Sequence, residues 1–138
     1  MPRIAYKNRY DLKKIDTADL AAWIKALRSG KYKQTQGDLR NFHGYCCLGV
    51  YCDVQAKEGK GAWDRMGNFA GGPQKRVGAK FPPLPMFNSG YVNPPLPYNG
   101  HWVECHNLND SVKLSFEEIA KKLEGLLRAA KRVQREQE

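Results

Sequence analysis

The sequence predicts an α+β fold in one small domain, residues 1–138, and three observations carry that prediction. Its 138 residues fit the usual length of one domain. Apolar residues make up 41% of the chain and charged residues 27%, the ordinary range of a globular protein. Two stretches near the ends repeat apolar residues at helical spacing, whereas a segment after the first stretch alternates and is flanked by turn residues.

A basic lead-in, residues 1–15, precedes the first predicted helix. Asp16 or Thr17 can cap that helix by accepting its unpaired backbone N–H groups, and Gly30 can end it in the left-handed conformation. The apolar stripe between these ends consists of Leu20, Trp23, Ile24 and Leu27. The pattern therefore predicts a helix that buries one face.

Residues 31–35 alternate and are rich in strand formers, which predicts a short strand. Turn residues at 37–38 and 41–44 flank Leu39 and Arg40, so we expect a two-stranded hairpin in this region. In such a strand Lys31 and Lys33 share one face, and Tyr32 and Gln34 share the other.

Residues 45–52 are apolar on every side, so this segment has to be buried. Periodicity alone does not separate a buried strand from a buried helix, and we favour a short core helix. Its Gly49 would allow close approach by a neighbouring element.

Residues 55–105 read as a long irregular insertion, because six of the eight prolines lie between Phe81 and Pro97 and glycines are frequent. The motif Pro-Pro-Leu-Pro occurs twice, at 82–85 and 94–97. Residues 100–105 are the best candidate for a strand that this reading would miss.

The last helix has the clearest start, a capping box in which Ser115 and Glu118 each satisfy a backbone donor of the other. Its apolar face is predicted to run to Ala130, and residues 131–138 are expected to fray. The residues of that face are Phe116, Ile119, Ala120, Leu123, Leu127 and Ala130.

Cysteine usage and the chain's N-terminal residues predict a cytoplasmic protein with reduced thiols. Cys46 and Cys47 are adjacent and cannot bridge each other without strain, and three of the four cysteines fall between 46 and 52. The first residues lack an apolar signal segment, and no apolar run approaches the roughly 20 residues of a membrane span. We expect no cofactor and no membrane partner.

Charge favours an anionic partner. The chain has 23 basic and 14 acidic residues, and residues 1–40 hold ten of the basic ones against four acidic. Lysine and arginine neutralise phosphates, and a tyrosine can stack on a base. The alternative is that the basic surplus only keeps the protein soluble. The predicted binding residues are Arg28, Lys31, Tyr32, Lys33, Gln34 and Arg40, with Lys13 and Lys14 nearby.

An enzymatic alternative uses Cys46 or Cys47 as a nucleophile with His101 as base, in the order found in papain-like hydrolases. Asn107, Asn109 or Asp110 would then orient the base, although buried core thiols explain the same cysteines more simply.

Three further motifs have simpler structural explanations. His101 and Cys105 could hold zinc with two of the other cysteines, but the usual paired ligand spacing is absent. Glycines at 59–61 and 71–72 fit ordinary turns better than a phosphate loop, and the proline motifs fit a braced loop better than a polyproline ligand.

Three segments, 23–34, 45–53 and 108–120, contain the pattern W-x3-LRSGKYKQ, CCLGVxCD and LNDS-x4-FEEIA. In this pattern the chain resembles small proteins of unknown function encoded by bacteriophages and prophages. The resemblance implies a phage or prophage origin, acting in the host cytoplasm, and assigns no catalytic residue. Together with the charge, it leads us to expect a non-enzymatic phage accessory protein that binds nucleic acid, a nucleotide or an acidic host protein and inhibits a host or defence function.

Overall fold

A computed structural model describes residues 6–8, 10–63, 65, 69–71 and 94–136. Its element order is η1 (Tyr6–Asn8), η2 (Leu12–Lys14), α1 (Thr17–Arg28), β1 (Arg40–Asn41), β2 (Gly44–Tyr45), α2 (Cys47–Lys57), β3 (Gly61–Trp63), β4 (Phe69–Gly71), β5 (Pro95–Tyr98), β6 (His101–Glu104), α3 (Cys105–Asp110) and α4 (Phe116–Arg135). Helices and small antiparallel hairpins confirm the α+β fold class. The first Pro-Pro-Leu-Pro motif lies outside the described residues.

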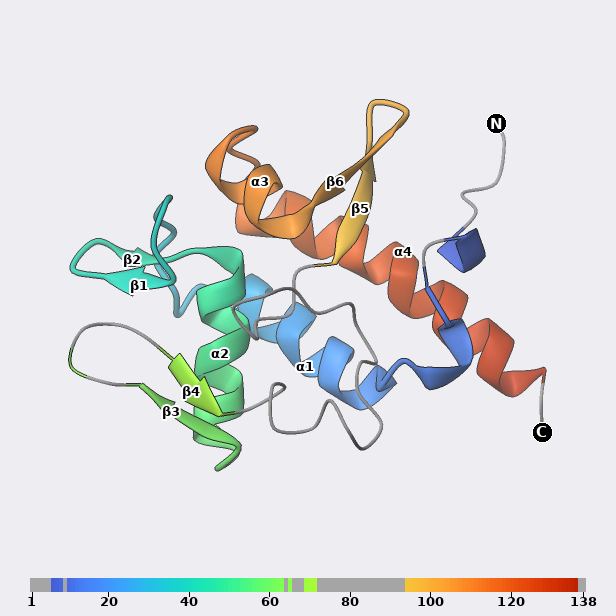
Figure 1. The fold of residues 1–138 in the computed structure, drawn as a ribbon, viewed down its shortest axis with the longest axis horizontal. Helices are drawn as coiled ribbons and strands as arrows, with labels where there is room; N and C mark the ends of the chain where they lie inside the picture. The colour runs from blue at the N-terminus through green and yellow to red at the C-terminus, as the bar shows by residue number, and fades with distance from the viewer. Residues whose placement is uncertain (1–5, 9, 64, 66–68, 72–93, 137–138) are drawn as a thin grey trace.

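The long helix α4 and the first helix α1 pack against each other in opposite directions (Figure 1). At one end of the pair, Arg28 of α1 bonds to Glu117 and Glu124 of α4. Near the other end, the side-chain amide of Gln134 donates to the backbone oxygens of Leu12 and Ile15. The antiparallel pair therefore forms the frame on which the other elements pack.

Both helices begin at the predicted caps. The Asp16 side chain accepts the backbone N–H of Asp19 at 2.9 Å, and Gly30 follows α1 at a φ of 77°. Ser115 and Glu118 form the expected capping box of α4. On the buried face of α4, Leu126 is fully buried, whereas Leu127 is half-buried.

The described residues near both ends of the chain pack more closely than the sequence suggests. In the lead-in, Tyr6, Tyr10, Leu12 and Ile15 are all buried. At the other end, α4 continues to Arg135, so the region expected to fray is helical over 131–135. The cause is the Gln134 side chain, whose two hydrogen bonds to the lead-in tie the last turns of the helix down.

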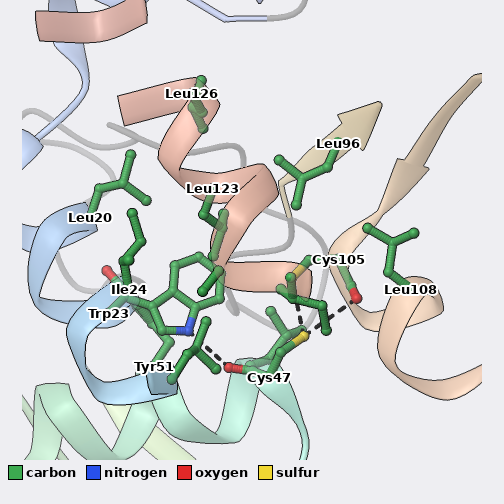
Figure 2. Close-up of a cluster of buried hydrophobic side chains, with 14 of the residues drawn as sticks. Leu20, Trp23, Ile24, Cys47, Tyr51, Leu96, Cys105, Leu108, Leu123 and Leu126 are labelled. Carbon is green, nitrogen blue, oxygen red and sulfur yellow. Dashed lines mark hydrogen bonds between the residues drawn. The ribbon is translucent and has the colours of Figure 1, made fainter. Parts of the chain in front are cut away.

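The cysteine-rich segment is the predicted core helix, α2, and it extends to Lys57. Its close approach to a neighbour is also present, because a Cβ at Gly49 would lie 1.8 Å from the carbonyl oxygen of Leu39. The indole N–H of Trp23 donates to the carbonyl oxygen of Cys47 at 3.0 Å and joins α1 to α2 (Figure 2).

The expected hairpin is present, and its strands are Arg40–Asn41 and Gly44–Tyr45. The strand expected at residues 31–35 does not belong to it. Residues 33–35 instead run beside β2 and make one parallel bridge, Gln34 to Tyr45. The predicted alternation survives without a strand, because Lys31 and Lys33 are exposed while Tyr32 and Gln34 turn inward to hydrogen-bond partners.

Within the expected irregular insertion, the structure places two hairpins, β3–β4 and β5–β6. The candidate strand at 100–105 contains β6, and its partner β5 contains the last three residues of the second Pro-Pro-Leu-Pro motif. Asn99 and Gly100 connect them with positive φ values of 50° and 80°, as a two-residue hairpin turn requires.

The outer edge of β5 is closed by other elements. Tyr10 donates its hydroxyl to the carbonyl oxygen of Pro95 at 2.6 Å, and the Lys122 ammonium donates to that of Pro97, also at 2.6 Å.

Candidate functional site

A cluster of aromatic and cationic side chains lies beside α2, where residues 31–35, the β1–β2 hairpin and β3 meet. We call it the aromatic–cation cluster, and it consists of Tyr32, Arg40, Tyr45, Asp53, Lys57 and Trp63. All three rings are half-buried, and α2 supplies both Asp53 and Lys57.

The rings pack edge to face in a row. The Tyr32 and Tyr45 ring centroids are 4.9 Å apart, and those of Tyr45 and Trp63 are 6.3 Å apart. A cation covers each end of the row: Lys57 Nζ lies 5.2 Å from the Tyr32 ring centroid, and Arg40 Cζ lies 4.4 Å from that of Trp63. These distances fit cation–π interactions.

Asp53 holds this row in place. Its carboxylate accepts the hydroxyl of Tyr32 at 2.6 Å and the indole N–H of Trp63 at 3.1 Å, and it pairs with Lys57 at 3.2 Å. Burial raises the pKa of Asp53, but these three donors outweigh burial, so the pKa lies below its ordinary value. The carboxylate is thus ionised and fixes two rings and one cation.

Phe42 projects from the tip of the β1–β2 hairpin and is 106% exposed, fully open to solvent. The turn beneath it is preformed, because the Asn41 side chain accepts the backbone N–H of His43 at 2.8 Å and donates to Asp38 at 2.9 Å. Lys33 is held beside this hairpin, since its carbonyl oxygen accepts the N–H of Tyr45 at 2.8 Å.

The six predicted binding residues separate into two groups. Arg40 and Tyr32 lie in the cluster, and Lys31 and Lys33 are exposed on the segment that contributes Tyr32. Arg28 and Gln34 have partners of their own in the fold, described next. The cluster residues that sequence reasoning missed are Tyr45, Asp53, Lys57, Trp63 and the neighbouring Phe42; the available signal was the helical spacing of Asp53 and Lys57.

Arg28 is paired across the α1–α4 interface, at 3.0 Å from Glu117 and 2.8 Å from Glu124. These hydrogen bonds raise the pKa of Arg28 above its ordinary value. Gln34 donates its side-chain amide to Asn109 at 2.7 Å and to the carbonyl oxygen of Leu114 at 2.8 Å. Lys13 and Lys14 lie in η2, at the other end of α1 from Arg28.

The thiols occupy a different environment, because all four cysteines are buried and unbridged. Burial, with a smaller effect from Cys47, raises the pKa of the Cys46 thiol to about 12, and burial raises the pKa of Cys47 and Cys52 as well. Cys47 Sγ lies 3.1 Å from Cys105 Sγ (Figure 2). A protonated thiol is a poor nucleophile, and this geometry favours the core interpretation over the hydrolase.

His101, the proposed base or zinc ligand, is exposed on β6, whereas the cysteines are buried. Across the part of the chain that the structure describes, no three His, Cys, Asp or Glu side chains are grouped so as to hold a metal ion. In the same part of the chain, no helix combines the length and apolar character needed to cross a bilayer.

One comparison with known proteins found a similarity. Residues 18–75 match a family model described as "Domain of unknown function (DUF8296)". Neither the curated proteins nor the solved structures contain a match to this chain. The matched span, from α1 to the residues after β4, contains every residue of the aromatic–cation cluster.

Proposed function

We propose that the protein is a non-enzymatic accessory protein that binds single-stranded nucleic acid through the aromatic–cation cluster and Phe42. The observation that carries the proposal is the fully exposed Phe42 ring on a preformed turn, in the hairpin that also contains Arg40 of the cluster. A solvent-exposed ring on an ordered turn offers a stacking surface to an unpaired base, and such stacking contributes about 1–3 kcal/mol per base.

Charge around the cluster supports an anionic ligand. Four cations and two carboxylates belong to the cluster or to the segments beside it, which leaves a surplus of two positive charges (4 − 2). The cations are Lys31, Lys33, Arg40 and Lys57, and the carboxylates are those of Asp38 and Asp53. Cations that flank stacking rings can neutralise the phosphates on either side of a stacked base. A duplex would hide its base faces, so the arrangement fits a single strand better.

Preorganisation supports the same ligand. Asp53 fixes Tyr32 and Trp63, and Asn41 fixes the turn below Phe42, before any ligand arrives. Side chains that are already ordered lose little conformational entropy on binding, so more of the stacking energy appears as affinity.

A bacteriophage or prophage origin and the inhibition of a host or defence function belong to the same proposal. Their support is the resemblance of segments 23–34, 45–53 and 108–120, of which the first two fall within the matched span 18–75. Binding an exposed strand is one direct way for a small protein to block an enzyme that acts on that strand.

The test is a fluorescence anisotropy titration with labelled single-stranded oligonucleotides and matched duplexes at several salt concentrations. We expect preference for the single strand, affinity that falls steeply with salt, and a loss of about 5- to 150-fold in Phe42→Ala, which is the stacking energy of one base.

The control is Lys121→Ala, an exposed cation on α4 outside the cluster, which should change affinity less than twofold. Equal affinity of Phe42→Ala and the wild type, a preference for the duplex, or salt-independent binding would each overturn the proposal.

A further inference from the structure

We propose that the C-terminal end of α4 and η2 together form a second cationic surface, which binds a separate segment of single strand through its phosphates. The inference rests on the proposed function for the class of ligand, but not on the cluster itself. We call this region the second surface; its residues are Lys13, Lys14, Arg128, Lys131, Arg132 and Arg135.

The fold brings the two basic segments together although they are far apart in sequence. The Gln134 side chain donates to the carbonyl oxygens of Leu12 and Ile15, at 3.0 and 2.9 Å, and so holds η2 against the last turns of α4. Lys13 and Lys14 lie between those two anchor points, and both are exposed. The backbone of these lysines is therefore held by hydrogen bonds on either side, and Lys14 Nζ lies 4.0 Å from the exposed carboxylate of Asp11.

The α4 cations form a four-membered group. Residues 128, 131, 132 and 135 are three or four positions apart, so each lies beside two others on the helix surface. Glu124 lies 3.6 Å from Arg128, and Glu136 lies 3.7 Å from Arg132. Lys131 and Arg135 have no ion pair with another described residue. Like charges at this spacing destabilise a helix, and a bound phosphate would relieve that repulsion.

The second surface is separate from the aromatic–cation cluster. Arg28, at the C-terminal end of α1, lies beside Glu117 and Glu124, whereas Ile15, just before α1, lies beside Gln134. The 12 residues of α1 span about 18 Å, so Arg28 lies about that far from the η2 end of the second surface. Figure 1 shows η2 and the end of α4 on one side of the molecule and the β1–β2 hairpin on the other.

The chemistry of the two surfaces also differs. The described aromatic residues near η2, Tyr6 and Tyr10, are buried, so the second surface offers charge without an exposed stacking ring. We therefore expect it to bind phosphates without base preference, and to lose affinity with salt more completely than the cluster does.

The test measures binding stoichiometry with an oligonucleotide of about six nucleotides, by native mass spectrometry and isothermal titration calorimetry at low salt. The wild type should bind two oligonucleotides. The double variant Lys131→Ala/Arg135→Ala should bind one, and so should the cluster variant Arg40→Ala/Phe42→Ala. With a longer strand, loss of two phosphate contacts should reduce the salt slope of log affinity by about 1.4.

The matched control is Lys25→Ala/Lys121→Ala, which removes the same two charges from exposed positions outside both surfaces and should still bind two oligonucleotides. A single site in the wild type that is lost in Arg40→Ala/Phe42→Ala overturns the second surface, and so does loss of one site in the control. A different result is possible if the wild type binds only one oligonucleotide. If that site survives in Arg40→Ala/Phe42→Ala but is lost in Lys131→Ala/Arg135→Ala, the proposal for the cluster is overturned and the proposal for the second surface is supported. No binding in any arm overturns both.

Discussion

The side-chain oxygen of Asn109 in α3 accepts the backbone N–H of Cys47, the first residue of α2, at 3.2 Å. The same oxygen accepts the Gln34 amide, and the Asn109 Nδ2 group donates to the carbonyl oxygen of Thr35 at 2.8 Å. One buried amide thus joins α2, α3 and the segment that supports the aromatic–cation cluster.

Asn109→Ala is expected to destabilise the protein by about 3 kcal/mol, because it leaves buried donors and an acceptor without partners. Urea unfolding followed by circular dichroism measures the change. Asn107→Ala is the control, since Asn107 lies half-buried in the same helix and makes no side-chain hydrogen bond to another described residue. Equal losses in the two variants would contradict the role of Asn109.

Gly49→Ala should destabilise the fold by about 2–3 kcal/mol, because the new Cβ would lie 1.8 Å from the carbonyl oxygen of Leu39 and force the backbones apart. Gly125→Ala in α4 provides the comparison. Its Cβ would meet only the Tyr6 hydroxyl, at 2.6 Å, which is the end of a side chain, and alanine favours the helix. Thermal unfolding should therefore show a clear drop for Gly49→Ala alone.

The thiols should react slowly with Ellman's reagent in the native state at neutral pH, and rapidly once the chain is unfolded in guanidinium. Burial raises the pKa of Cys46 to about 12 and keeps the reactive thiolate scarce. Counting released thiolate with and without denaturant measures the difference. Rapid labelling of one cysteine in the native protein at pH 7 would show an accessible thiol and would support the cysteine-hydrolase hypothesis.

Asp53→Asn is expected to cost about 1 kcal/mol at pH 7, through the lost charge–charge and charge-assisted contacts. The folded pKa of Asp53 lies below the ordinary 3.8, so its contribution is present above that value and disappears as pH falls through the folded pKa. Urea titrations from pH 7 to pH 2 should show the two proteins converging in acid. Glu136→Gln, an exposed carboxylate, should shift stability by less than about 0.5 kcal/mol throughout.

The sequence predicts α1 and α4 well because their determinants are local. Asp16, Ser115 and Gly30 act within one turn of the helix ends they define, and the apolar face of α4 repeats along the chain itself. Strands β3 to β6 are three or four residues long, too short to show a period, and the prolines of β5 argue against a strand. The Asn99-Gly100 pair was the overlooked hairpin signal.

The site is harder to predict, because its contacts join distant residues. Arg28 is 89 and 96 positions from its partners Glu117 and Glu124, so no local pattern reveals that this charge is already neutralised. The alternation of 31–34 did separate Lys31 and Lys33 from Tyr32 and Gln34 correctly. The covering of Trp63 by Arg40, by contrast, depends on how β3 and the hairpin meet on α2.

The prolines of β5 also limit what its outer edge can offer to another strand. With a two-residue turn, Tyr98 and His101 form a hydrogen-bonded pair. Such pairs alternate along an antiparallel ladder, so the backbone groups of Pro97 and Pro95 point away from β6. Both are proline and have no N–H to offer, while Tyr10 and Lys122 occupy their carbonyl oxygens. An incoming strand finds neither donors nor acceptors at these positions. This edge therefore resists the sheet extension by which fibrils grow.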